Sequence, residues 1–193
     1  MTIARQHQLK RAISSALYIH GIIEYNAGEF EKARIDLDES LQIARELNNP
    51  RLIMAPLNSL ADIHCAVGEM EPALKIYEEC LHISQQLRDR YNEAMYDNNL
   101  GTVYHYLEQY ERAAALYQQS MTICRDIGDE NGVSIALSNL GELALLAEDY
   151  SRAESYFVEG LTIARKTADI WSILANLNNL GLALTHLGQM EKA

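Results

Sequence analysis

The chain of 193 residues matches itself at a shift of 40 residues, and this period limits the possible fold more than any other feature. A small residue recurs once per period, and an alanine follows it twelve residues later without a gap. Internal periods of roughly 20–50 residues are typical of solenoids, in which each repeat packs on its neighbours. The two columns are Gly21, Ala61, Gly101, Gly141 and Gly181, and Ala33, Ala73, Ala113, Ala153 and Ala193.

Each repeat is predicted to form an antiparallel pair of helices. Apolar residues recur at spacings of three and four, as in Leu74, Tyr77 and Leu81, which indicates helices rather than strands. A residue suited to cap a helix N-terminus precedes each first helix, and a two-residue turn precedes each second helix. The caps are Asn49, Asp89, Asp129 and Asp169, and the turns are Gly28-Glu29, Gly68-Glu69, Glu108-Gln109 and Glu148-Asp149.

The third repeat carries a recognisable pattern: Leu100-Gly101, Tyr104, Ala113, Tyr117 and Ser120 occur in this order. In this the chain resembles the tetratricopeptide repeat (TPR) family. The resemblance implies an all-α, right-handed solenoid of helical hairpins, that is, a TPR-like superhelix. The 40-residue unit is longer than the usual ~34 residues, and is similar to the repeats of kinesin light chains, spindle-orientation scaffolds and the sensor arrays of maltose-regulator-type bacterial activators. HEAT repeats have a similar period, but the Leu-Gly and Ala columns disfavour them.

The register predicts a single array over residues 1–193. Residues 1–7 are expected to end a preceding second helix, and residues 168–193 to form an incomplete fifth repeat. Four complete helix pairs are predicted at 8–47, 48–87, 88–127 and 128–167. Both termini then fall inside a repeat, which favours a fragment of a longer array. Because the last helix would lack its partner, we expect Leu180, Leu184 and Leu187 to be partly exposed and to promote end-to-end self-association.

The candidate binding site consists of polar side chains on the first helices, opposite their packing side. The family resemblance implies that this side lines a concave groove. Asn is a poor helix former, yet it recurs here, and its amide can donate to and accept from an extended peptide backbone. The same amides are equally suited to bond one another and stabilise the superhelix, so both roles stay open. The candidate groove residues are Asn58, Asp62, Asn98, Asn99, Thr102, His105, Tyr106, Asn139, Glu142, Asn178 and Asn179.

The charge balance narrows the choice of partner. Sixteen Lys and Arg against 27 Asp and Glu give a net charge of -11, which argues against binding to nucleic acid or anionic membranes. The candidate groove contains no Lys or Arg, so it does not match the TPR subfamily that clamps a terminal carboxylate. Asp62 and Glu142 instead favour a neutral to basic peptide or protein segment with apolar anchors. Three Cys without a CxxC pair indicate a reducing compartment, and we expect a cytoplasmic protein.

No sequence motif indicates catalysis. Phosphate-binding loops, dinucleotide fingerprints and hydrolase motifs are missing, so we expect neither an enzyme nor a cofactor. Cys65 and His105 share one groove column, but a metal site requires more convergent ligands, and none is predicted. Cys80 and Cys124 are predicted to be small packing residues. Two local predictions concern Trp171, expected to pack on the neighbouring second helix, and Pro56, expected to kink its helix or delay its start.

The sequence therefore favours a non-catalytic module that recognises an extended peptide segment in its groove, as part of a larger scaffold or regulator. One alternative is a segment of a bacterial STAND- or LuxR-type regulator that senses a small inducer or holds an ATPase in check. A second alternative is a structural spacer without a groove ligand.

Overall fold

The computed structural model describes residues 3–188, and these fold into nine α-helices. They divide into two compact units, unit 1 up to Gln86 and unit 2 from Leu87 onward, so the division coincides with a repeat boundary. The second helix expected to begin in residues 189–193, like residues 1–2 of the expected preceding helix, lies outside the described residues.

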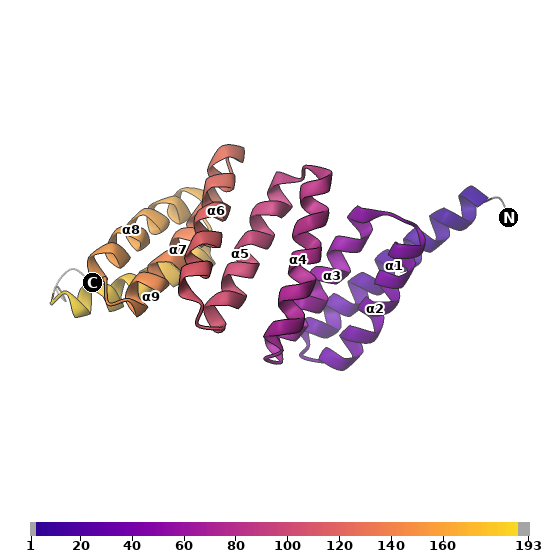
Figure 1. Cartoon of the computed structure of the whole chain (residues 1–193), viewed down its shortest axis with the longest axis horizontal. Coiled ribbons are helices and arrows are strands. Elements are labelled where there is room, and N and C mark those ends of the chain that lie inside the picture. Colours follow the sequence, from indigo (N-terminus) through magenta and orange to yellow (C-terminus); the bar gives the residue numbers. More distant parts are fainter. Residues whose placement is uncertain (1–2, 189–193) are drawn as a thin grey trace. The chain divides into compact units, whose positions relative to one another are not determined.

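Unit 1 contains the first two helix pairs. Helices α1 and α2 pack against each other, and α2 packs on α3, as Figure 1 shows in indigo and purple. The helices are α1 (Ile3–Asn26), α2 (Phe30–Glu46), α3 (Pro50–Ala66) and α4 (Met70–Leu87).

Unit 2 contains two further pairs and a ninth helix. Helices α5 and α6 form one pair and α7 and α8 the next, while α9 packs against both α7 and α8 (Figure 1). The helices are α5 (Arg90–Tyr106), α6 (Tyr110–Ile127), α7 (Glu130–Leu146), α8 (Tyr150–Thr167) and α9 (Ile170–His186). Their boundaries repeat every 40 residues, as predicted from the sequence.

The predicted caps start the first helices. Each cap side chain accepts a hydrogen bond from a backbone amide of the first helical turn, which satisfies a donor that has no partner within the helix. The acceptor–donor pairs are Asn49 with Leu52, Asp89 with Asn92, Asp129 with Gly132, and Asp169 with Trp171 and Ser172. The prediction for this column is confirmed.

The turn within each helix pair requires a left-handed backbone conformation. Gly28 and Gly68 adopt it with φ of 79° and 84°, and glycine does so without steric cost. Glu108 and Glu148 occupy the same column with φ of 58°, although they carry a Cβ. The turn geometry is therefore kept in repeats whose local sequence does not favour it, at a cost of roughly 1–2 kcal/mol per residue.

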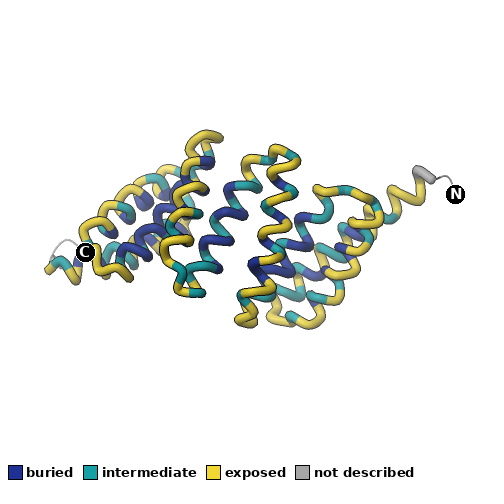
Figure 2. Tube along the Cα trace, in the orientation of Figure 1, coloured by how far each residue is buried: buried dark blue, intermediate teal, exposed yellow. Residues whose placement is uncertain are grey.

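The column of small residues allows the two helices of a pair to approach closely. A Cβ added to Gly101 would lie 2.7 Å from the ring of Tyr117, and one added to Gly141 would lie 2.4 Å from the ring of Phe157. The aromatic ring occupies the space of the missing side chain, so these two columns form one packing contact. Figure 2 shows the resulting buried residues along the facing sides of the paired helices within each unit.

The N-terminal helix differs from the prediction. Residues 3–7 were expected to end a preceding helix, but they continue into α1 without interruption. The position of the caps corresponds to Leu9 in the first repeat. Leucine has no side-chain oxygen to accept a first-turn amide, so nothing marks a new helix start there. The predicted boundary before residue 8 is therefore wrong for the described residues.

Several local predictions were also tested. Helix α3 begins at Pro50 and continues past the buried Pro56, so its start is not delayed. Trp171 is 83% exposed and does not pack as expected. Leu180 and Leu187 are partly exposed as expected, whereas Leu184 is buried. Cys80 and Cys124 are buried packing residues, as predicted. Among the described residues, no helix is long and apolar enough to cross a membrane.

Candidate functional site

The predicted groove residues of unit 2 lie on three first helices. Helix α7 lies against α5 on one side and α9 on the other, so side chains from all three helices can meet. Most of the predicted side chains are half-buried; Tyr106 and Asn178 are exposed. Residues Asn58 and Asp62 lie on α3 in unit 1. Of the predicted residues, Asn58 and Asp62 thus belong to unit 1 and the others to unit 2.

Hydrogen bonds link the three first helices of unit 2. The Asn139 Nδ2 group donates to Asn98 Oδ1 at 2.9 Å, and the Asn179 Nδ2 group donates to Glu142 Oε1 at 3.0 Å. We call these four residues the amide row. Each bond joins one repeat to the next, so the row has the structural role that the sequence left open. An amide has two donors and an acceptor with two lone pairs, so the row retains capacity for a ligand.

A first hollow lies at the N-terminal halves of α5 and α7 and has a volume of about 220 Å³. Asn98 of the amide row forms part of its wall, and Met95 and Ile135 give it an apolar side. We call it the Met95 hollow. Its lining residues are Tyr91, Ala94, Met95, Asn98, Asn99, Ser120, Cys124, Asp129, Asn131, Gly132 and Ile135.

A second hollow lies toward the C-terminal ends of α5, α7 and α9 and has a volume of about 360 Å³. Its walls are mostly apolar, and Glu142 of the amide row supplies a carboxylate. The rings of Tyr150 and His186 stack within it, with centroids 4.4 Å apart and planes almost parallel. We call it the Glu142 hollow. Its lining residues are His105, Glu142, Leu145, Leu146, Tyr150, Leu182 and His186.

The sequence did not identify the apolar and aromatic residues of the Glu142 hollow. Leu145 and Leu146 end α7, Leu182 lies on α9, and Tyr150 begins the second helix α8. A signal was present, because Leu146 and Leu182 are large apolar residues on the exposed side of first helices. The contribution of α8 could not be found by reading first helices alone.

In unit 1, the Asp62 carboxylate is hydrogen-bonded within its own repeat. Asp62 accepts a hydrogen bond from the Tyr77 hydroxyl and another from Asn58 Nδ2 at 2.8 Å. Burial raises the pKa of Asp62, although both hydrogen bonds oppose this shift. Burial, together with the adjacent Asp62 charge, also raises the pKa of Tyr77. Asp62 was predicted as a groove carboxylate, but its two oxygens are engaged inside the helix pair.

A model of the tetratricopeptide repeat matches residues 12–86, 52–126 and 92–166. The chain belongs to the tetratricopeptide repeat family. This confirms the family resemblance and the all-α solenoid fold class predicted from the sequence. Tetratricopeptide repeats generally mediate protein–protein interaction, and the fold is typically a non-catalytic module that binds proteins or peptides.

Solved structures with the same fold include proteins of three kinds. BtubC (BKLC) from P. vanneervenii has a TM-score of 0.82 and 25% identity, covering 95% of this chain and 76% of that one. A putative kinesin light chain of Podospora anserina has a TM-score of 0.73 and 17% identity, covering 95% and 90%. A STAND protein with a tetratricopeptide repeat sensor from Pyrococcus horikoshii has a TM-score of 0.75 and 16% identity, covering 92% and 26%. No curated protein matches the sequence significantly.

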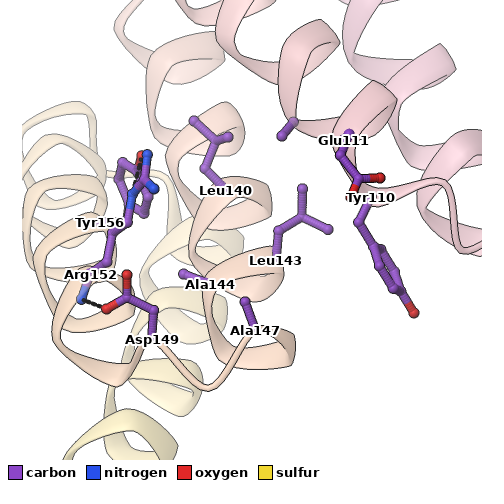
Figure 3. A pocket seen from close by; sticks show the side chains of 10 residues that line it. Tyr110, Glu111, Leu140, Leu143, Ala144, Ala147, Asp149, Arg152 and Tyr156 are labelled. Carbon is purple, nitrogen blue, oxygen red and sulfur yellow. Dashed lines mark hydrogen bonds between the residues drawn. The ribbon is translucent and has the colours of Figure 1, made fainter.

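A third hollow, of about 240 Å³, lies between α6 and α8, which are the second helices of the third and fourth repeats. Leu140, Leu143 and Ala144 of α7 form its apolar floor, and Arg152 lies beside Tyr156 at one edge (Figure 3). We call it the Tyr110 hollow. Its lining residues are Tyr110, Glu111, Ala114, Leu140, Leu143, Ala144, Ala147, Asp149, Arg152 and Tyr156. None of the predicted groove residues lies in it.

The repeat register explains the Tyr110 hollow. Ala144 stands where the third repeat has Tyr104, and Ala147 stands where it has Leu107. The missing side-chain volume leaves an open space between the helices. The hollow is therefore a local packing variation of one repeat. The two alanines, at positions where the third repeat has larger residues, indicate it in the sequence.

A group of potential metal ligands lies in unit 1. His20 and Glu24 of α1 and Asp36 of α2 each offer one ligand atom, and these atoms lie within 4.8 Å of one another. His20 Nδ1 pairs with the Asp36 carboxylate and lies 3.7 Å from Glu24 Oε2. The hydrogen bond to Asp36, together with the Glu24 charge, raises the pKa of His20. This ion-pair group links the two helices of the first repeat.

Proposed function

We propose that this chain binds an extended segment of a partner protein across the amide row of unit 2. The arrangement of the row between the Met95 hollow and the Glu142 hollow carries this proposal. The amides suit the N–H and C=O groups of a peptide backbone, and the hollows suit its side chains. Proteins and peptides are the usual partners of the family, and the proposed role is binding without catalysis.

The helix geometry gives the spacing of the two anchors. Met95 and His105 line different hollows and are ten residues apart on α5. At 1.5 Å per residue this distance is about 15 Å, which corresponds to about four or five residues of extended chain. Alternate residues of an extended chain point to the same side. We therefore expect two anchor side chains about four residues apart, with the backbone between them on the amide row.

The charge of the site favours a neutral to basic segment. The residues of the amide row and of the two flanking hollows include no Lys or Arg. Asp129 in the Met95 hollow and Glu142 in the Glu142 hollow supply carboxylates, and the chain carries a net charge of -11. An acidic segment would meet repulsion here and no cation to offset it.

A random library of 12-residue peptides displayed on phage would test the proposal. Peptides selected on the wild type should bind an Asn98→Ala, Asn139→Ala double variant at least tenfold more weakly, as measured by biolayer interferometry. Gln118→Ala, which removes an exposed amide on α6, is the control and should bind as the wild type does. Thermal melting would verify that both variants fold.

Three outcomes would contradict the proposal. Unchanged affinity in the double variant would exclude the amide row as a contact surface. A selection without binders would favour the structural spacer. Binding of a small molecule instead of peptides would favour the alternative of a regulator sensor, for which the similarity to the P. horikoshii protein is support from fold alone.

Three further expectations remain proposals. We infer that residues 1–193 form one tetratricopeptide repeat array, and that the protein is cytoplasmic. We also infer that the chain self-associates through α9. Besides the partly exposed Leu180 and Leu187, further apolar side chains support self-association: those exposed on α9 are Ile170, Trp171, Leu174, Leu177 and Leu182. Sedimentation velocity should show association at high concentration that Trp171→Asp abolishes; a monomer at every concentration would contradict it.

A further inference from the structure

We propose that the Glu142 hollow binds an arginine side chain of the partner segment. This inference rests on the proposed function, because the segment that crosses the amide row would bring the arginine to the hollow. It names the residue type of one of the two anchors.

The repeat register explains why Glu142 faces the hollow. In the second repeat the Tyr77 hydroxyl donates to Asp62, and in the third the Tyr117 hydroxyl donates to Thr102 at 3.3 Å. The residue equivalent to these tyrosines in the fourth repeat is Phe157, which has no hydroxyl. Glu142, equivalent to Asp62, therefore makes no such bond inside its own repeat and instead accepts one from α9.

The Glu142 carboxylate is positioned but retains capacity for a ligand. Asn179 Nδ2 holds Oε1 at 3.0 Å, which limits the movement of the side chain. A carboxylate accepts about four hydrogen bonds. The negative charge also acts on its surroundings, since it contributes, after burial, to raising the pKa of Tyr117 to about 12. A bidentate guanidinium would add two charge-assisted hydrogen bonds to this group.

The walls of the hollow match the rest of an arginine side chain. Leu145, Leu146 and Leu182 offer apolar surface for its methylene stem. Tyr150 and His186 also line the hollow, and an aromatic ring is a group on which a planar guanidinium can stack. Lysine has no planar group and forms no bidentate contact, so it fits this combination less well.

The chain itself uses the same contact twice. The guanidinium of Arg112 lies over the ring of Tyr104, and that of Arg152 lies over the ring of Tyr156, each 5.5 Å from the ring centre. Arg152 lines the Tyr110 hollow (Figure 3) together with the carboxylates of Glu111 and Asp149, so a guanidinium already lies beside them. The lining of the Glu142 hollow contains a carboxylate and no Lys or Arg. Of these two hollows, only the Glu142 hollow offers a carboxylate without a guanidinium of the chain beside it, which favours a cationic ligand there.

Titration with N-acetyl-arginine amide, followed by two-dimensional NMR, would test the hollow directly. The backbone signals of Leu145, Leu146 and Leu182 should shift. N-acetyl-citrulline amide, which has nearly the same shape without the charge, should bind at least fivefold more weakly. Glu142→Gln should reduce binding of the arginine probe to the level of the citrulline probe. Glu111→Gln, in the Tyr110 hollow, is the matched control and should leave binding unchanged.

The arginine site can be disproved while the proposed peptide binding across the amide row still holds. Equal binding of both probes, shifts confined to other residues, or an unchanged affinity in Glu142→Gln would overturn the arginine site. Selected 12-residue peptides that depend on Asn98 and Asn139 but show no preference for arginine would overturn it as well, and would leave the proposed function standing. Selected peptides that contain arginine and lose affinity in Glu142→Gln would support both.

Discussion

The two units share the 40-residue pattern, but Asp62 in unit 1 and the amide row in unit 2 differ in their hydrogen-bond partners. In unit 1, Asp62 is bound by Tyr77 and Asn58, all within the second repeat. In unit 2, the amide row forms its hydrogen bonds from one repeat to the next. The hydrogen bonds of Asp62 stabilise a single helix pair, whereas those of the amide row join the first helices of neighbouring repeats. This difference between Asp62 and the amide row favours unit 2 as the location of the proposed binding surface.

Unit 2 also contains a polar group that unit 1 lacks. Asp97 occupies a column that holds Leu57 in unit 1 and Leu137 in the next repeat. It is fully buried, and neither of its oxygens makes a hydrogen bond of normal geometry among the described residues. Burial, with the nearby Glu93 charge, raises the pKa of Asp97 to about 7, although Gln119 and Arg90 act in the opposite direction.

The largest effect is expected from Asp97→Leu, which makes this column apolar again. The folded state holds the proton more tightly than the unfolded chain, so the stability of the wild type should fall as pH rises from about 4 to about 7. At pH 8 the variant should gain about 2 kcal/mol, or roughly 4–8 °C in melting temperature, with a smaller gain at pH 5. Calorimetry of both proteins at pH 5 and pH 8 measures the change in melting temperature.

Leu137→Asp is the matched control for this column. It should lower the melting temperature and introduce a pH dependence of the same sign. A loss of stability in Asp97→Leu at pH 8 would show that the buried carboxylate has a stabilising partner.

Tyr77→Phe should have the next largest effect, because it removes a donor from the half-buried Asp62. The expected cost is about 1–2 kcal/mol in urea denaturation. Tyr117→Phe is the equivalent change in unit 2 and removes a longer bond to a neutral hydroxyl, so it should cost less, about 0.5 kcal/mol. An equal loss of stability in both variants would show that the two tyrosine hydroxyls contribute equally, contrary to the expected difference between the units.

Ala144→Leu should stabilise unit 2 by partly filling the Tyr110 hollow (Figure 3). We expect a gain of up to about 1 kcal/mol, because added apolar volume enters existing space. Ala153→Leu adds the same volume at a fully buried site of close helix contact and should destabilise the fold. Thermal melting of both variants measures the difference; destabilisation by Ala144→Leu would show that the hollow closes in solution.

The smallest effect concerns the ion-pair group of unit 1. NMR titration should give His20 a pKa above its usual value near 6.5, and Asp36→Asn should lower it toward that value. The stabilising contribution of this pair should be present below pH 6.5 and lost as pH rises through the folded pKa. An unchanged His20 titration in Asp36→Asn would contradict the hydrogen bond.

Local patterns predicted the helices well because the signals are local. The cap at Asp129 and the turn at Gly68 each depend on a few neighbouring residues. Gly101 and Tyr117 were recognised as part of the repeat pattern, whereas their close approach became visible only in the packed helix pair. The continuous helix α1 was missed because a repeat register was applied to Leu9, which lacks the capping chemistry.

The candidate site was predicted only in part. The sequence placed Asn98 and Asn139 on one face, but it could not show that they bond to each other. It identified Asp62 and Glu142 as equivalent carboxylates, yet only the first meets a tyrosine hydroxyl. Tyr150 was missed because it reaches the Glu142 hollow from a second helix.

The sequence by itself determined the 40-residue period, the helix pairs, their caps and turns, and the family, because each depends on residues close together in the chain or on their regular recurrence. Only the tertiary structure decided which polar groups are consumed inside the fold and which remain on its surface. That outcome depends on whether a hydroxyl, an amide or a phenyl ring lies opposite a given carboxylate after the helices have packed. For Asp62 it is the hydroxyl of Tyr77; for Glu142 it is the amide of Asn179, which leaves the carboxylate in the hollow.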